Sequence, residues 1–147
     1  MIGAPLRSQW RLQAEGVAVE TAFSVVSDVE RYPEFVPGAL AARVLARSGN
    51  RWRVDNAFGF GPVRLRFVSE ADVDPLRRLT IHSTDGPWRS LIVDWRLAER
   101  DGACLLDFVA TLDFRSPFVA ALARVAASEA ERRIRSAFAA RLLAAGG

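Results

Sequence analysis

Few side chains of this sequence are suited to chemistry at an active site. His82 is the single histidine and Cys104 the single cysteine among 147 residues. Nucleophilic catalysis needs a base next to the nucleophile, and a conventional zinc site needs several Cys or His ligands. Strand alternation places Leu79 and Ile81 inward and His82 outward, while Cys104 is more typical of a core residue. We therefore predict no catalytic residue and no metal site.

Inward-facing polar residues on strands are the remaining chemical candidates. These candidates are Asn56, Ser69, Ser83, Asp94 and Asp107. Asn56 has the same parity as Val54 and Phe58, so we expect it to point inward, whereas alternation places Asp94 and Asp107 outward. One or two inward polar groups suffice to hydrogen-bond a bound carbonyl oxygen, but they are few for repeated carbonyl chemistry. The polar residues therefore favour binding over catalysis.

Residues 28–38, Asp-Val-Glu-Arg-Tyr-Pro-Glu-Phe-Val-Pro-Gly, form an unusual segment. Pro33 and Pro37 each fix a φ angle and lack a backbone N–H, so a regular helix cannot continue through them. The stiffened bend presents Tyr32, Phe35 and Val36. Two interpretations stay open: a connection whose aromatic rings fill the core, or a segment that borders a ligand site.

The charged residues narrow the partners and the location. All 20 basic residues are arginine, the net charge is +3, and the arginines are scattered rather than clustered. This pattern lacks the footprint of a nucleic-acid-binding protein, so we expect no DNA partner, whereas a transient contact with an anionic membrane surface stays open. No apolar run reaches the ~18 residues of a membrane span, and no secretory signal is visible. With a single cysteine, we expect a cytoplasmic protein, with contact at the inner face of the cell membrane left open.

Hydrophobic periodicity predicts one domain over residues 1–147, of the α+β class. Residues 10–14 alternate as a first strand, 19–27 form a short helix, and Ser116-Pro117 begins a long helix that runs to about Leu143. The other predicted strands are 40–48, 51–58, 62–72, 77–84, 88–99 and 103–114. Short turns make consecutive strands antiparallel, and a sheet of about seven strands curls around the last helix.

The last helix carries an apolar stripe at 3.6-residue spacing. The stripe consists of Phe118, Leu122, Val125, Ala126, Ala130, Ile134, Ala137 and Phe138. Ala126 and Ala130 are small, whereas the facing strand positions are large. Such a pairing either lets the helix pack closely or leaves an apolar space of the kind that binds small molecules. Both alternatives stay open.

Two segments together resemble the ubiquinone-binding Coq10 family, part of the START-like, polyketide cyclase/dehydrase superfamily with the helix-grip (Bet v 1-like) fold. They are Asp-Gly-Pro-Trp-Arg-Ser-Leu at 85–91, leading to Trp95, and Tyr-Pro-Glu-Phe-Val-Pro at 32–37. Residues 25–29, the Phe-Arg-Ser-Pro junction at 114–117 and residues 133–141 agree, so the resemblance spans about 8–143. One departure is Trp88, where many family members have Phe.

The resemblance implies a non-catalytic carrier of a hydrophobic small molecule, namely ubiquinone or a related prenylquinone that supports respiratory electron transport, with no covalent cofactor. It also leaves two alternatives: a polyketide cyclase or aromatase that uses the same cavity, and a RatA-type toxin that contacts the ribosome. Ligand entry would involve 30–38 and the turns at 58–62 and 85–89, which we expect to form one rim. The residues expected to line the site or its mouth are Tyr32, Phe35, Val36, Pro37, Asn56, Phe58, Phe60, Phe67, Trp88, Leu91, Trp95, Phe108, Phe118, Leu122 and Ala126.

Overall fold

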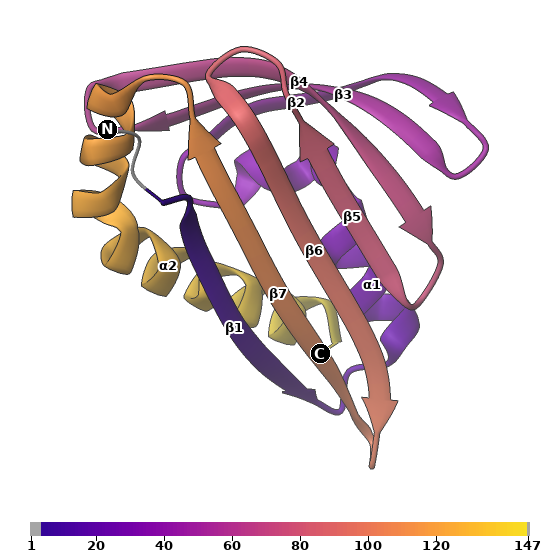
Figure 1. The fold of residues 1–147 in the computed structure, drawn as a ribbon. Helices are drawn as coiled ribbons and strands as arrows, with labels where there is room; N and C mark the ends of the chain where they lie inside the picture. Colours follow the sequence, from indigo (N-terminus) through magenta and orange to yellow (C-terminus); the bar gives the residue numbers. More distant parts are fainter. Residues whose placement is uncertain (1–3, 147) are drawn as a thin grey trace.

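The computed structural model describes residues 4–146 and contains seven strands, two α-helices and one 3₁₀ helix in these residues (Figure 1). The chain begins with strand β1 (Leu6–Glu15), helix α1 (Val19–Ser27) and the 3₁₀ helix η1 (Val29–Glu34). The remaining elements are β2 (Ala39–Ser48), β3 (Arg51–Phe60), β4 (Val63–Asp74), β5 (Arg78–Ser83), β6 (Trp88–Arg100), β7 (Ala103–Phe114) and α2 (Pro117–Gly146). The predicted order of elements is confirmed.

All seven strands form one antiparallel sheet in the order β1-β7-β6-β5-β4-β3-β2. Each strand from β2 to β6 pairs with the next strand in the sequence, and β1 pairs with β7 at the other end of the sheet. The sheet curls, and α1 and α2 lie behind its front strands in Figure 1, on the concave side. The curved antiparallel sheet with a long C-terminal helix is therefore confirmed.

Helix α2 begins as its sequence predicts. The Ser116 hydroxyl accepts a hydrogen bond from the Val119 N–H at 3.2 Å, and Pro117 is the first helical residue. The helix contacts β1, α1 and β7. No helix within residues 4–146 is long and apolar enough to cross a membrane.

The predicted stripe on α2 is wrong at two positions. Phe118 is 62% exposed and Val125 is 88% exposed. In the first turns the helix instead turns Val119 and Ala123 toward the sheet. Apolar residues occupy every side of these turns, so periodicity alone does not select the buried side.

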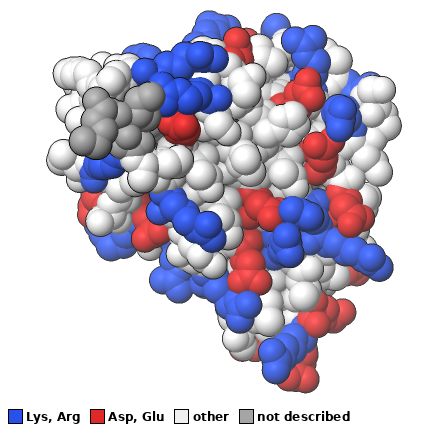
Figure 2. Space-filling model, viewed as in Figure 1, with Lys and Arg blue, Asp and Glu red and all other residues white. Residues whose placement is uncertain are grey.

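The convex face of the sheet carries alternating charges (Figure 2). Arg11 pairs with Asp107 at 2.6 Å, and Arg78 pairs with Asp94 at 2.9 Å. The imidazole Nε2 of His82 lies 3.6 Å from a carboxylate oxygen of Asp72 on the same face. These pairs confirm the outward orientation predicted for Asp94, Asp107 and His82, and as exposed pairs each adds little to stability.

Candidate functional site

The concave face is packed into two aromatic clusters. The first centres on Trp95, which is 1% exposed and whose ring lies 5.4 Å from Trp10, 4.9 Å from Phe108 and 4.8 Å from Phe138. The indole of Trp10 also stacks on Phe108 at 4.5 Å. We call this the Trp95 cluster. Trp95 and Phe108, both predicted site residues, thus pack against protein side chains of the core.

The second cluster centres on Trp88, which is 4% exposed. Its ring lies 5.4 Å from Phe67 and 4.7 Å from Phe114. Leu65, Leu91 and Ala123 complete the buried part of this Trp88 cluster, and the half-buried Phe60 packs against it. Four predicted site residues, Trp88, Phe67, Leu91 and Phe60, are therefore close together.

Besides Pro37 and Phe118, four predicted site residues belong to neither cluster. Asn56 and Phe58 on β3 and Leu122 and Ala126 on α2 all keep intermediate exposure. Asn56 and Phe58 share the inward parity of Val54, which is 2% exposed. Helix α2 packs mainly on β1, α1 and β7. We call these four half-buried residues the accessible stretch.

Asn56 points inward as predicted, but its amide donor is already used. Its Nδ2 donates to the Ser69 hydroxyl at 2.9 Å and to the backbone carbonyls of Val54 and Phe67 at 3.1 and 3.3 Å. The Ser83 hydroxyl donates to the carbonyl of Val68 at 2.6 Å and accepts from the N–H of Asp85 at 3.1 Å. These inner polar groups therefore mainly satisfy one another and the sheet.

The segment 28–38 is anchored at both ends. The Tyr32 hydroxyl donates to the carbonyl of Val26, and burial, aided by the nearby Asp28 charge, raises the pKa of this phenol. The rings of Tyr32 and Phe35 meet Phe138 edge-on at 5.5 and 5.1 Å. In this structure both rings fill the core.

Of the three segments expected to form one rim, 30–38 and 58–62 are in contact, because the Gly59 N–H donates to the Gly38 carbonyl at 2.8 Å. Phe35 packs beside the Trp95 cluster, whereas Trp88 and Phe60 belong to or border the Trp88 cluster. The remaining predicted residues are spread: Val36 is buried in the Trp95 cluster, Pro37 is half-buried, and Phe118 is exposed. Gly38 lies against the end of β3, because a Cβ at this position would be 2.6 Å from the Phe58 ring. Its φ of +89° also favours glycine.

Two shallow hollows lie away from the predicted site residues. One, of about 560 Å³, is bordered by Val19, Leu76 and Leu97 together with charged residues at the ends of β5 and β6. The other, of about 500 Å³, lies between Asn50 and Thr80. Neither is lined by a predicted site residue.

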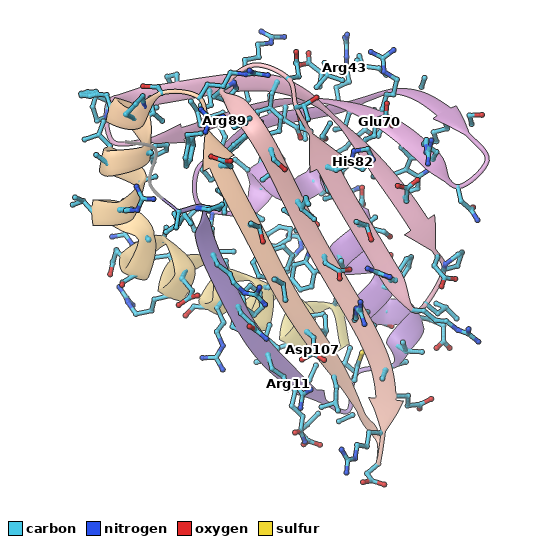
Figure 3. All side chains as sticks on the ribbon, in the orientation of Figure 1. Arg11, Arg43, Glu70, His82, Arg89 and Asp107 are labelled. Carbon is cyan, nitrogen blue, oxygen red and sulfur yellow. The ribbon has the colours of Figure 1, made fainter. Side chains whose placement is uncertain are left out.

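The charged and thiol groups offer no second site. Among residues 4–146 no three His, Cys, Asp or Glu side chains are grouped to hold a metal ion. Cys104 is fully buried, and burial raises the pKa of its thiol. His82, labelled in Figure 3 beside Glu70, lies on the face opposite the accessible stretch.

Trp88 reaches the concave face through a β-bulge that sequence reasoning missed. Trp88 pairs with Phe114 but Ser90 pairs with Asp113, so one extra residue, Arg89, is inserted in β6. By simple alternation from Leu91, Arg89 would face inward and Trp88 outward. The bulge reverses this, and the Arg89 guanidinium lies 3.5 Å from Asp113.

Comparison with known proteins is consistent with this architecture. Residues 16–139 match the family described as polyketide cyclase / dehydrase and lipid transport. The coenzyme Q-binding protein COQ10 homolog B of Xenopus laevis is 31% identical over 93% of this chain, which spans about 60% of that protein. The ribosome association toxin RatA of Pseudomonas aeruginosa is 31% identical over 67% of this chain and 69% of its own length. The crystal structure of TTHA0849 from Thermus thermophilus superposes with a TM-score of 0.80 at 16% identity, covering 97% of this chain and 100% of that one.

Proposed function

Because this chain belongs to the polyketide cyclase/dehydrase and lipid transport family, we propose that it binds a hydrophobic small molecule on the concave face, without covalent chemistry. The observation that carries this proposal is that Asn56, Phe58, Leu122 and Ala126 stay partly exposed and belong to neither packed cluster. Apolar side chains that stay half-exposed on the inside of a curved sheet are suited to a ligand that covers them.

The ligand class proposed is a polyprenylated quinone such as ubiquinone. The similarity to a protein named as coenzyme Q-binding supports this choice. A prenyl tail gains roughly 0.8 kcal/mol per CH₂ group that leaves water, so a few contacts with Phe58, Leu122 and Ala126 already favour binding. The proposed role is that of a carrier in respiratory electron transport.

A carrier of such a lipid has to meet a membrane, and the first turns of α2 are the proposed contact. Phe118 and Val125 are seven residues apart and both exposed, and no acidic residue occurs between 117 and 128. Arg115 precedes Phe118 and Arg124 precedes Val125, and the two guanidinium groups donate to the backbone carbonyls of Thr84 and Ala4, respectively. Exposed apolar groups with nearby arginines fit an anionic lipid surface. The proposal is a cytoplasmic protein that contacts the inner face of the cell membrane.

Two other functions are weaker on this structure. A cyclase needs several inward polar groups that orient and activate carbonyl groups, but the Asn56 amide already donates within the sheet. A ribosome contact is suggested by the RatA similarity. Binding to RNA would draw on exposed arginines, yet on the convex face Arg11 and Arg78 already pair with carboxylates.

The proposal is tested by transfer from a membrane. Purified protein is incubated with phosphatidylcholine vesicles that contain ubiquinone, the vesicles are removed, and the quinone that remains with the protein is measured by ultraviolet absorbance. We expect close to one quinone per chain, with little dependence on salt. Absence of quinone together with salt-sensitive binding to ribosomes would replace the carrier function with the ribosome-directed one.

A further inference from the structure

We propose that the indole N–H of Trp88 is the polar anchor of the ligand site and donates a hydrogen bond to a carbonyl oxygen of the ligand. This inference rests on the proposed function, and it deepens that function by naming the group that recognises a quinone head rather than any apolar lipid. It depends on three observations: a donor without a partner, a bulge that orients it, and its closeness to the accessible stretch.

The donor is buried and unpaired. Trp88 Nε1 is inaccessible to solvent and has no hydrogen-bond partner among the described residues. A buried N–H without an acceptor is unfavourable, and buried indoles normally find one. The other inner polar groups do not share this property, because Asn56, Ser69 and Ser83 are hydrogen-bonded to one another or to the sheet. An acceptor supplied by a ligand would satisfy the donor that this part of the protein leaves unpaired.

The bulge in β6 supports a role beyond packing. Without it, strand alternation would place the Trp88 side chain on the convex face and Arg89 inside. Bulges frequently re-orient a side chain next to a functional site. The turn before it is equally specific: Gly86 has φ +60°, and a Cβ there would lie 2.5 Å from the carbonyl oxygen of Arg66.

Trp88 borders the accessible stretch through Phe67. The Trp88 ring meets Phe67 edge-on at 5.4 Å, and Phe67 is the cross-strand partner of Asn56. A ligand whose tail covers Phe58 and Ala126 can therefore direct its head toward the Trp88 cluster. Access to Nε1 requires movement of side chains in this cluster, and half-buried members such as Phe60 and Leu6 retain exposure.

The N–H selects the chemical class of the ligand. It donates and cannot accept, so it recognises a carbonyl or ether oxygen and adds nothing for a pure hydrocarbon. In the ligand-free protein this N–H makes no hydrogen bond that would have to break. Most of the free energy of the new hydrogen bond therefore contributes to the affinity for the ligand. The expected effect of removing it is about a tenfold weaker affinity for a quinone.

The test compares two probes on the wild-type protein and on the W88F variant, which keeps an aromatic ring but lacks the N–H. The probes are a ubiquinone with two isoprene units and geranylbenzene, which has the same tail on a ring without carbonyl groups. Affinities are measured by calorimetric titration. In parallel, the indole N–H resonance of Trp88, assigned by its loss in W88F, is followed by ¹⁵N NMR during each titration.

We expect W88F to bind the quinone about tenfold more weakly, to bind geranylbenzene unchanged, and to keep or raise the melting temperature of the ligand-free protein, because an unpaired buried donor is removed. The Trp88 resonance should move downfield with the quinone alone. Equal weakening of both probes, or an unmoved resonance on quinone binding, would overturn the inference while leaving the carrier function intact. Binding of neither probe by the wild-type protein would overturn the proposed function itself.

Discussion

The guanidinium of Arg141 lies 4.8 Å from the centre of the Phe35 ring, and its Nη2 donates to the Glu34 carboxylate at 2.9 Å. These contacts join the end of η1 to the C-terminal part of α2. At the other side of η1, the Glu30 carboxylate accepts a hydrogen bond from the N–H of Val44 on β2 at 3.0 Å. The segment 28–38 is thus fastened between the last helix and an edge strand.

Loss of the Arg141 contacts should loosen this segment. In Arg141→Ala we expect the amides of Phe35 and Val36, which both donate to the Tyr32 carbonyl, to exchange with solvent severalfold faster. Hydrogen exchange followed by mass spectrometry measures this. Arg133→Ala is the matched control, since Arg133 pairs with Glu129 on an exposed part of the same helix. Equal acceleration in both variants would show that the effect is general destabilisation of α2.

The same contact predicts a pH dependence. The hydrogen bond from Arg141, together with the charges of Arg31 and Arg141, lowers the pKa of Glu34 despite the opposing effect of desolvation. A carboxylate whose pKa is lower in the folded state stabilises the protein above its unfolded pKa, near 4.5, and this contribution is lost as the pH falls through the folded value. The melting temperature of wild type minus that of Glu34→Gln should therefore be positive at pH 7 and shrink as the pH falls below about 4.5. A difference that does not change with pH would contradict the assigned pairing.

Two phenylalanines on α2 should differ sharply in their contribution to stability. Phe138 is 2% exposed and contacts Trp10, Tyr32, Phe35 and Trp95, whereas Phe118 is 62% exposed. We expect Phe138→Ala to lower the free energy of unfolding by about 3–5 kcal/mol and Phe118→Ala to change it by less than about 0.5 kcal/mol. Denaturant unfolding of both variants measures this. A large loss in Phe118→Ala would mean that the first turns of α2 are packed in solution.

The proposed membrane contact depends on the same exposed phenylalanine. Phe118→Ser combined with Val125→Ser should reduce cosedimentation with vesicles that contain anionic phospholipid, while leaving the melting temperature unchanged. Leu143→Ser is a control, because Leu143 is 65% exposed near the opposite end of α2. Vesicle binding that survives the double substitution would exclude this part of α2 as the contact.

Much of the fold follows from local patterns. The alternation along 51–58 and 103–114 predicts strands, and the structure has strands there. Ser116-Pro117 predicts a helix start, and α2 begins at this point. The extent of α2 was underestimated, because the helix continues to Gly146 through residues that carry no stop signal before the glycines. The 3₁₀ helix at 29–34 follows from Pro33, which prevents a longer α-helix.

The candidate site was less predictable, for reasons visible at single residues. The bulge at Arg89 reverses the orientation of Trp88, and period-2 alternation contains no information about an inserted residue. The hydrogen bonds of Asn56 to Ser69 and to the carbonyl of Phe67 depend on the register between β3 and β4. The sequence motifs suggest that Phe35 and Trp88 lie on one rim. In the structure Phe35 packs with Phe138 in the second half of α2, whereas Trp88 belongs to the cluster that contains Ala123 in the first half of this helix.

The most direct test of ligand binding on the concave face is to fill the accessible stretch. Ala126 is half-buried on α2, and Ser128 is exposed two residues further on the same helix. Quinone uptake from vesicles is measured for wild type, Ala126→Phe and Ser128→Phe, each first shown to be folded by circular dichroism. We predict at least about a tenfold loss of bound quinone in Ala126→Phe, because the added ring occupies the volume of the ligand tail, and no loss in Ser128→Phe. Undiminished uptake by a folded Ala126→Phe protein would contradict binding at this site.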